Sequence, residues 1–253
     1  MANNEAHKID YYKNGNIQRE RYYFNDKLHN ENGPAEIWYY NNGIINREFW
    51  YNNGKLHRED GPAMIHYYKN SNVQYKKYYF NGKLHNENNP AEIWYYNNGA
   101  INQEFWYTNG KIARDNEPAI IDYYENGVIR CKKYYANNKP YRENGPAEIW
   151  YYNNGKINQE FWCNNGKFHN ENEPVIIKYN RNGSIRDKEY YLNGEFVMTD
   201  KEIEKYINST KPIKVRTINK LKILYNVCKA RNLENKIEEI GSILLLKTLQ
   251  NDI

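Results

Sequence analysis

Alternating apolar and polar residues recur in short runs along most of the chain. Two such runs, residues 36–40 and 46–50, are rich in Ile, Trp, Tyr and Phe and flank an Asn-Asn-Gly turn signal. A period of two places successive side chains on opposite faces of a strand. The pattern therefore predicts paired β-strands joined by tight turns.

The runs belong to a 28-residue repeat. One proline and one tyrosine of each unit keep this spacing without insertion or deletion. The prolines are Pro34, Pro62, Pro90, Pro118, Pro146 and Pro174. The tyrosines are Tyr11, Tyr39, Tyr67, Tyr95, Tyr123, Tyr151 and Tyr179. Self-similarity at a fixed period is the signature of a repeat architecture. We predict seven contiguous 28-residue β-hairpin units over residues 8–196.

Each unit carries two turn signals and a closing loop. The turns contain Asn-Gly, as in Asn42-Gly43 and Asn53-Gly54, and both residues tolerate the positive φ of tight hairpins. Asp26 and Asn138 replace Gly at the second turn and tolerate the same region, whereas Ser71 is a poor substitute at the first. Proline in the closing loop indicates a strand start or edge, because it cannot donate to a ladder.

A second period, two units long, is superimposed on the first, because neighbouring units differ in type. All six tryptophans fall into two alternating columns, which are Trp38, Trp94 and Trp150, and Trp50, Trp106 and Trp162. Duplication of a two-hairpin block explains this alternation, and so does a selected stripe of Trp on a binding face. Aromatic residues also stabilise a thin sheet through cross-strand contacts, which favours a structural use of the six positions, and a candidate interaction surface is the alternative. Likewise, acidic Glu48 alternates with basic Lys76 in one column, which predicts attraction between neighbouring units.

The turn and loop motifs resemble those of the MORN-repeat superfamily, in its second, longer variant. The motifs are Tyr-Tyr-x-Asn-Gly, x-Asn-Gly-Lys and Gly-Pro-Ala, and the run 53–63 is similar to repeat proteins of mimivirus-like giant DNA viruses. The resemblance implies a mainly β fold, an elongated single-layer twisted antiparallel sheet of hairpins. It also implies association with membrane lipids, protein scaffolding or dimer formation, and one bacterial branch is antitoxin-like. The Asn or Glu before Pro90, Pro118 and Pro174 departs from the Gly-Pro pattern.

The repeat pattern stops after Phe196, and residues 199–253 form a second predicted domain that is α-helical. Thr199 and Glu202 have the spacing of a capping box that opens a helix. Two further helices are expected over residues 216–231 and 233–249. Repeat arrays need terminal caps, so this segment is interpreted as a C-terminal cap.

The basic excess of the chain lies in this segment. Residues 200–253 contain 11 Lys or Arg and 7 Asp or Glu, so they carry +4 of the net charge of +5. The candidate contacts to phosphate or anionic lipid are Lys211, Lys214, Arg216, Lys220 and Lys222. A basic interaction arm is therefore the alternative to a cap.

Some of the repeated polar residues are of the types that form metal or catalytic sites. One column contains the histidines His29, His57, His85 and His169. Successive units are about 9.6 Å apart, so these histidines cannot share a metal ion with its ~2 Å bonds. We expect them to bond within the loops, to the acidic column of Glu31, Glu59, Glu87 and Glu171. That column offers no catalytic pair, because acid and base roles need distinct pKa values. The sequence predicts no enzyme activity, cofactor, metal or disulfide framework.

The sequence favours a non-catalytic scaffold for protein–protein interaction or self-association. A membrane-surface protein that uses the basic C-terminal helices, or an antitoxin-like binding protein, are the alternatives, and nucleic acid is disfavoured. The first ten residues contain no apolar segment of the kind found in signal peptides, and no run is long enough to span a bilayer. An intracellular location follows, in the host cytoplasm or the virion if the protein is viral.

Overall fold

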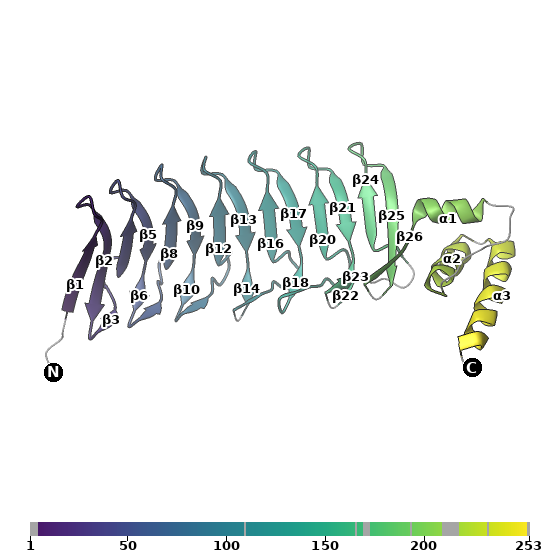
Figure 1. Cartoon of the computed structure of the whole chain (residues 1–253), viewed down its shortest axis with the longest axis horizontal. Coiled ribbons are helices and arrows are strands. Elements are labelled where there is room, and N and C mark those ends of the chain that lie inside the picture. The colour runs from purple at the N-terminus through teal and green to yellow at the C-terminus, as the bar shows by residue number, and fades with distance from the viewer. Residues whose placement is uncertain are drawn as a thin grey trace. The chain divides into compact units, whose positions relative to one another are not determined.

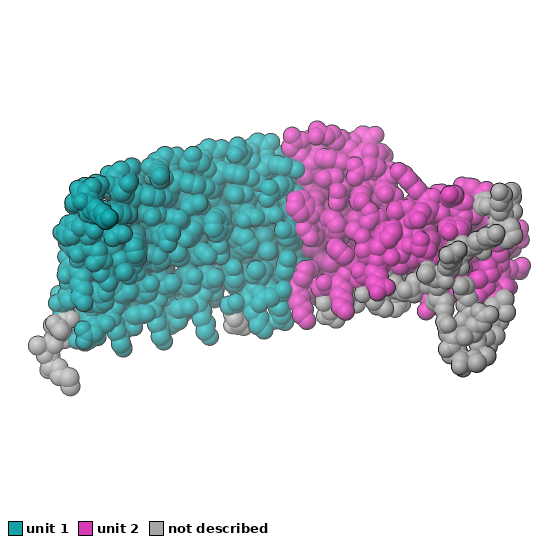
Figure 2. Space-filling model, in the orientation of Figure 1, with its two compact units in different colours: residues 1–138 teal, residues 139–253 magenta. Residues whose placement is uncertain are grey.

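The computed structural model divides into two compact units, residues 1–138 and 139–253, which are coloured separately in Figure 2. We call them the N-terminal unit and the C-terminal unit and describe each by itself. The structure describes residues 5–108, 110–164, 166–168, 173–192, 194–208, 218–231 and 233–251.

The N-terminal unit is an antiparallel sheet of hairpins that lie side by side (Figure 1). In hydrogen-bonding order its strands are β1 (Glu5–Tyr11), β2 (Ile17–Phe24), β4 (Glu36–Tyr39), β5 (Ile45–Phe49), β8 (Met64–Tyr67), β9 (Val73–Lys77), β12 (Glu92–Tyr95), β13 (Ile101–Phe105), β16 (Ile120–Tyr123) and β17 (Ile129–Lys133). Two-residue strands follow most hairpins and pair locally. They are β3 (Lys27–Leu28), β6 (Tyr51–Asn52), β7 (Lys55–Leu56), β10 (Tyr79–Phe80), β11 (Lys83–Leu84), β14 (Tyr107–Thr108), β15 (Lys111–Ile112) and β18 (Tyr135–Ala136).

The C-terminal unit contains two further hairpins and three helices. Its strands are β19 (Lys139–Pro140), β20 (Glu148–Tyr151), β21 (Ile157–Phe161), β22 (Cys163–Asn164), β23 (Lys167–Phe168), β24 (Ile176–Tyr179), β25 (Ile185–Leu192) and β26 (Glu195–Thr199). Its helices are α1 (Asp200–Ile207), α2 (Ile218–Ala230) and α3 (Glu234–Asn251). The predicted fold class, mainly β with antiparallel hairpins and helices towards the C-terminus, is confirmed.

The two turns of a repeat differ in geometry. At the second turn, Asn53 and Gly54 both have positive φ, 50° and 81°, as the Asn-Gly signal predicts. Asp26 adopts φ 60° and replaces glycine there. At the first turn only the last residue is left-handed, with Gly43 at φ 86° and its N–H donating to the Tyr40 carbonyl at 2.9 Å. The asparagine before it was wrongly assigned a positive φ; its side chain instead accepts the N–H of a later residue, as Asn42 Oδ1 does from Ile44 at 3.2 Å.

In five of the repeats, the second tyrosine of the Tyr-Tyr pair before the first turn joins one repeat to the next. The Tyr40 hydroxyl donates to the Tyr67 carbonyl at 2.8 Å, and the Tyr68 hydroxyl donates to the Tyr95 carbonyl at 2.9 Å. The same bond recurs from Tyr12 to Tyr39, from Tyr96 to Tyr123 and from Tyr152 to Tyr179. Phenylalanine would keep the ring but lose this bond, which explains the choice of tyrosine at this position of the repeat.

The packing between hairpins alternates in chemistry along the sheet. Arg21 lies opposite Glu36 and Lys77 lies opposite Glu92, so these junctions are ionic. The intervening junctions are apolar. They place Phe49 opposite Met64, Phe105 opposite Ile120 and, in the C-terminal unit, Phe161 opposite Ile176. The two-repeat period is therefore a period of complementary contacts between strands.

The largest apolar core lies under the helices of the C-terminal unit. Val197 and Met198 on β26 are buried against Leu221 and Leu224 of α2. Further members of this core are Tyr190, Ile203, Ile223, Val227, Cys228 and Ile240. The helices thus cover one side of β26, as a cap would. The predicted boundary between domains at residues 8–196 and 199–253 stays a prediction.

The helix ends agree closely with the sequence pattern. Thr199 is the N-cap of α1 and forms the predicted capping box with Glu202. The other two helices begin and end within two residues of the predicted ranges 216–231 and 233–249. Phe196 is 51% exposed although the helices are present, so they do not cover this side chain of β26.

Candidate interaction surface

The two tryptophan columns lie on opposite faces of the sheet. Trp38 lies opposite Arg47 on β5, so it shares a face with Arg47 and Phe49. Trp50 follows Phe49 and continues the ladder by donating its backbone N–H to the Ala63 carbonyl at 2.8 Å, so its side chain faces the other way. The six tryptophans therefore do not form one stripe. We call the face with Trp38 the carboxylate face and the face with Trp50 the tyrosine face.

On the carboxylate face, the tryptophan side chains donate hydrogen bonds to buried carboxylates. Glu36 is 5% exposed and accepts the Trp38 Nε1–H at 2.6 Å, while Arg19 reaches the same carboxylate at 2.6 Å. Arg19 also stacks on the Trp38 ring, 4.5 Å from its centroid. Because a buried carboxylate is costly without a cation and hydrogen bonds, the indole N–H has a structural role here.

The same arrangement recurs two repeats later. Glu92 is 6% exposed, accepts the Trp94 Nε1–H at 2.5 Å and lies 3.1 Å from Lys77 Nζ. The Tyr107 hydroxyl donates to its other oxygen at 3.2 Å. In the C-terminal unit the Trp150 indole donates to Glu148 at 2.8 Å. The first tryptophan column is thus explained by the carboxylate two residues before each tryptophan, which accepts the indole N–H.

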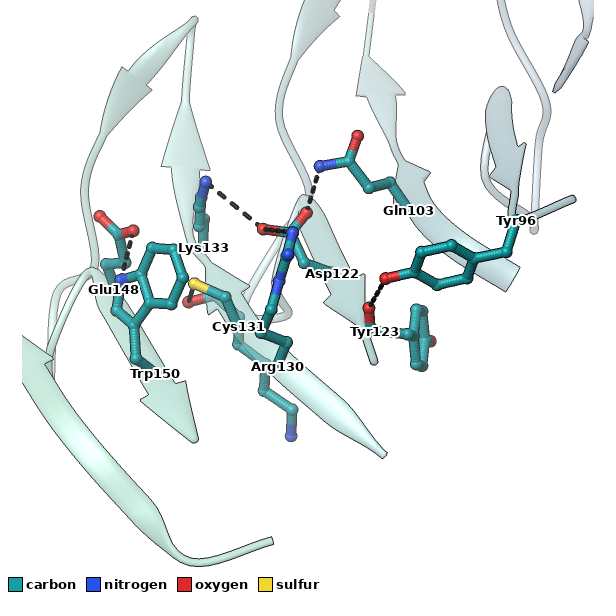
Figure 3. Close-up of polar contacts among 10 residues, drawn as sticks. Tyr96, Gln103, Asp122, Tyr123, Arg130, Cys131, Lys133, Glu148 and Trp150 are labelled. Atoms are coloured by element: carbon teal, nitrogen blue, oxygen red, sulfur yellow. Dashed lines mark hydrogen bonds and ion pairs between the residues drawn. The ribbon is translucent and has the colours of Figure 1, made fainter. Parts of the chain in front are cut away.

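Asp122 occupies a tryptophan position of this column and is 2% exposed (Figure 3). It accepts a hydrogen bond from Gln103 Nε2 at 2.8 Å and lies 3.5 Å from Lys133 Nζ. Arg130 is a third polar partner, at 3.9 Å. A carboxylate enclosed by three donors is a structural anion.

The half-buried cysteine of the C-terminal unit is not an activated nucleophile. Burial raises the pKa of the Cys163 thiol to about 11, so the thiolate is scarce near neutral pH.

The tyrosine face carries the alternating charged column. Tyr67 donates to Glu48 at 2.5 Å and Tyr123 donates to Glu104 at 2.6 Å. Burial, followed by these bonds, raises the pKa of both tyrosines strongly. The Lys76 ammonium instead lies 5.5 Å from the centre of the Tyr95 ring. The expected attraction between Glu and Lys of neighbouring repeats is replaced by contacts with tyrosine, because an intervening strand separates the two columns.

Two tryptophans of the second column, Trp50 and Trp106, line clefts between the closing loops. The Arg58 guanidinium stacks on Trp50, 4.2 Å from the ring centre, beside a cleft of about 860 Å³. We call this the Trp50 cleft; its lining includes His29, Glu31, Trp50, Arg58, Glu59 and Asp60. The Trp106 cleft repeats it at about 240 Å³, where Arg114 stacks on Trp106 at 4.3 Å. Its acidic residues are Glu87 and Asp115. Trp162 is half-buried in the C-terminal unit.

Histidines hold the loops beside the clefts. His57 Nδ1 accepts the N–H of Asn81 at 3.2 Å, and its other nitrogen lies 3.7 Å from Glu59. His29 makes the equivalent contacts with Asn53 and Glu31. The predicted loop role of these two histidines is confirmed, whereas His169 and Glu171 lie outside the described residues. Within the described part of the chain, no three His, Cys, Asp or Glu residues are placed to hold a metal ion.

The basic tail is described only in part. Lys220 lies 3.9 Å from Glu202, and Lys222 is exposed on α2. The remaining predicted anion contacts, Lys211, Lys214 and Arg216, lie outside the described residues. None of the described helices is long and apolar enough to cross a membrane.

Sequence reasoning missed the arginines that stack on tryptophan. Arg58 and Arg114 are two repeats apart, whereas Asn30 and Asn86 occupy the same column in the alternate repeats. That alternation was the available signal. It was obscured by Arg142, which breaks the period one repeat later.

Comparison with known proteins agrees with this repeat geometry. The family model of a MORN repeat variant matches residues 6–28 and 147–161, which contain the β1–β2 hairpin except its first residue and the whole β20–β21 hairpin. No curated protein matches the chain. The match supports the MORN-repeat family and its usual character, a non-catalytic repeat scaffold that binds proteins or membrane lipids. It does not bear on the resemblance to giant-virus proteins.

Proposed function

We propose that this protein is a non-catalytic repeat scaffold that binds protein partners in the Trp50 and Trp106 clefts. The observation that carries the proposal is the recurrence of the same cleft two repeats apart, each with a tryptophan, a stacked arginine and acidic side chains. Equivalent sites at regular spacing suit recognition along a partner. Catalysis, in contrast, needs one site with distinct acid and base environments.

The chemistry of the clefts favours a basic partner segment. Glu31, Glu59 and Asp60 outnumber the single Arg58 at the Trp50 cleft. Glu31 and Glu59 are 83% and 78% exposed, so they are available to a ligand. A lysine or arginine of the partner can pack its apolar stem on tryptophan and place its charge near these carboxylates.

The spacing of the clefts sets a length for the partner. Two repeats contain four strand spacings, which is about 19 Å. An extended peptide covers that distance in about six residues at ~3.3 Å per residue. Two basic side chains about six residues apart should therefore occupy both clefts at once, which raises affinity through effective concentration.

Fluorescence anisotropy with synthetic peptides tests the proposal. Peptides with two arginines about six positions apart should bind more tightly than peptides with a closer pair or with glutamates in their place. Trp50→Ala combined with Trp106→Ala should weaken binding at least about tenfold. Ile185→Ala changes a 51% exposed residue of the C-terminal unit and is the matched control. Equal binding of all peptides by all variants would refute the assignment.

A second candidate function is attachment to an anionic membrane surface, which the exposed Lys222 and the +4 charge of residues 200–253 favour. Flotation with phosphatidylserine liposomes distinguishes it: Lys222→Glu would then abolish binding in a salt-dependent way. An antitoxin-like role, a viral origin and an intracellular location rest on the sequence resemblance and composition alone and belong to the same proposal.

A further inference from the structure

The first strand of the sheet has an open edge. Within the described residues, β1 pairs with β2 and has no strand on its other side. The equivalent strand one repeat later, β4, uses that same edge to pair with β2, where Ile37 lies opposite Glu20 and Ala35 accepts the N–H of Tyr22. The residues of β1 at these two columns are Ile9 and His7, one repeat earlier.

The outward backbone groups of β1 follow from this equivalence. Alternate residues of an antiparallel strand direct their N–H and C=O to opposite sides. His7, Ile9 and Tyr11 therefore present their backbone groups to the open edge, while Lys8 and Asp10 bond towards β2. The side chains at this edge include two large exposed apolar groups, Ile9 at 36% and Tyr11 at 59% exposed.

The last strand of the C-terminal unit, β26, differs from β1 because helices cover it. The helices pack against β26, and its Val197 and Met198 are 3% and 0% exposed. An uncovered edge with apolar side chains is a template for pairing with another strand. The β1 edge thus has the properties of an interface.

We propose that β1 pairs antiparallel with β1 of a second copy of this chain, about a two-fold axis at Ile9. In this register Ile9 lies opposite Ile9 of the second copy, and His7 lies opposite Tyr11. These are the residues with outward backbone groups, so each pair can exchange two hydrogen bonds. Lys8 then lies opposite Asp10 of the second copy, and the symmetry repeats this ion pair.

Neighbouring registers are less favourable. An axis at Lys8 places the two lysines directly opposite each other, which is destabilising. In that register His7 lies opposite Ile9 of the second copy, so the contact between the two Ile9 side chains and the Lys8–Asp10 pairs are lost. An axis at His7 places Ile9 opposite Glu5 and separates Lys8 from Asp10. Only the axis at Ile9 combines the backbone bonds, the apolar contact and both ion pairs.

The alternative role of Lys8 is to prevent association at this edge. Lysine on an edge strand is also a device that keeps sheets from pairing, and Lys8 has a contact within its own chain, 5.1 Å from the centre of the Tyr23 ring. If Lys8 protects the edge, removing its charge increases association. If Lys8 pairs with Asp10 of a second copy, reversing its charge weakens association.

Sedimentation velocity on the full chain tests the proposal. A short two-strand interface is small, so dimerisation should appear with a Kd on the order of 10–100 µM, as a shift from 30.5 kDa towards twice that mass. Lys8→Asp should weaken the dimer about tenfold, because two attractive pairs become repulsive. The double variant Lys8→Asp, Asp10→Lys should restore it. Asp10 also pairs with Arg21 at 2.6 Å, so circular dichroism should verify that the double variant folds.

A matched pair of variants controls for the apolar contact. Ile9→Lys places like charges at the axis and should abolish the dimer. Ile101 is equally exposed, at 36%, but lies on the interior strand β13, so Ile101→Lys should leave the dimer intact. Peptide binding in the Trp50 cleft should be unchanged by Ile9→Lys, which separates this proposal from the proposed function.

Carbodiimide cross-linking of a mixture of nitrogen-14 and nitrogen-15 protein tests the register. A Lys8–Asp10 cross-link that contains both isotopes is expected. A protein that stays monomeric well above the expected Kd, a dimer that Ile9→Lys does not change, or stronger association of Lys8→Asp would each overturn the proposal.

Discussion

The hydroxyl of Tyr68 should stabilise the array by a measurable amount. It donates to the Tyr95 carbonyl of the next repeat at 2.9 Å, and both residues are half-buried. Tyr68→Phe retains the ring packing and removes only this bond. The net value of such a bond is about 0.5–1.5 kcal/mol. For a chain of this size, a loss of about 1 kcal/mol lowers Tm by roughly 2–4 °C.

The bond is repeated, which allows a second measurement. The N-terminal unit contains it at Tyr12, Tyr40, Tyr68 and Tyr96. Repeat arrays are approximately sums of single-repeat and nearest-neighbour terms. Replacing all four tyrosines by phenylalanine should therefore cost about 4 kcal/mol, unless some repeats are lost altogether.

Urea denaturation and native-state hydrogen exchange are the assays. Exchange is needed because a long array need not unfold in one step, and it should show the loss concentrated around residues 68–95 for Tyr68→Phe. Tyr141→Phe is the control, since that side chain is 40% exposed and its hydroxyl can be solvated. If Tyr68→Phe and Tyr141→Phe have the same stability, the hydroxyls do not join the repeats and the reasoning is wrong.

Three further outcomes are expected. Gly99→Val should destabilise the array locally in thermal melts, because φ is 86° and a β-branched residue is strained there, whereas Gly33→Ala should be nearly neutral. The pKa of His66 is lowered from 6.5 to about 4, chiefly by burial, so the folded protein binds fewer protons than the unfolded chain between these pH values. The free energy of unfolding should therefore fall as the pH drops from 6.5 through about 4. Urea titrations of His66→Gln should show a smaller loss over the same pH range. Deletion of residues 200–253 should expose Met198 and cause aggregation in light scattering, and a soluble monomer would contradict the cap.

The regular parts of the fold follow from sequence because local chemistry determines them. The spacing of Asn53-Gly54 predicts the tight second turn, and Thr199 with Glu202 predicts the start of α1, as the structure confirms. The 28-residue spacing of tyrosine and proline was enough to predict the repeated hairpins. Each of these features depends on residues close together in the chain.

The candidate site was harder to predict because it depends on register and on contacts between repeats. The position of a residue within the repeat does not reveal that the side chains of Trp38 and Trp50 lie on opposite faces of the sheet. Their orientation follows from the backbone hydrogen bonds that pair β5 with its neighbouring strands. Nor does it reveal that Trp38 donates to a buried Glu36. A repeat column shows which positions are equivalent, but not which neighbouring strand supplies the partner.

The alternation of ionic and apolar junctions limits how such an array can change length. Excision of one repeat, containing β8 and β9, would bring Phe49 against Glu92 and leave a buried carboxylate without Lys77. Excision of two repeats would instead bring Phe49 against Ile120, an apolar match. Recombination within the gene should therefore be tolerated in steps of two repeats, and viable relatives should differ in length by whole pairs of hairpins.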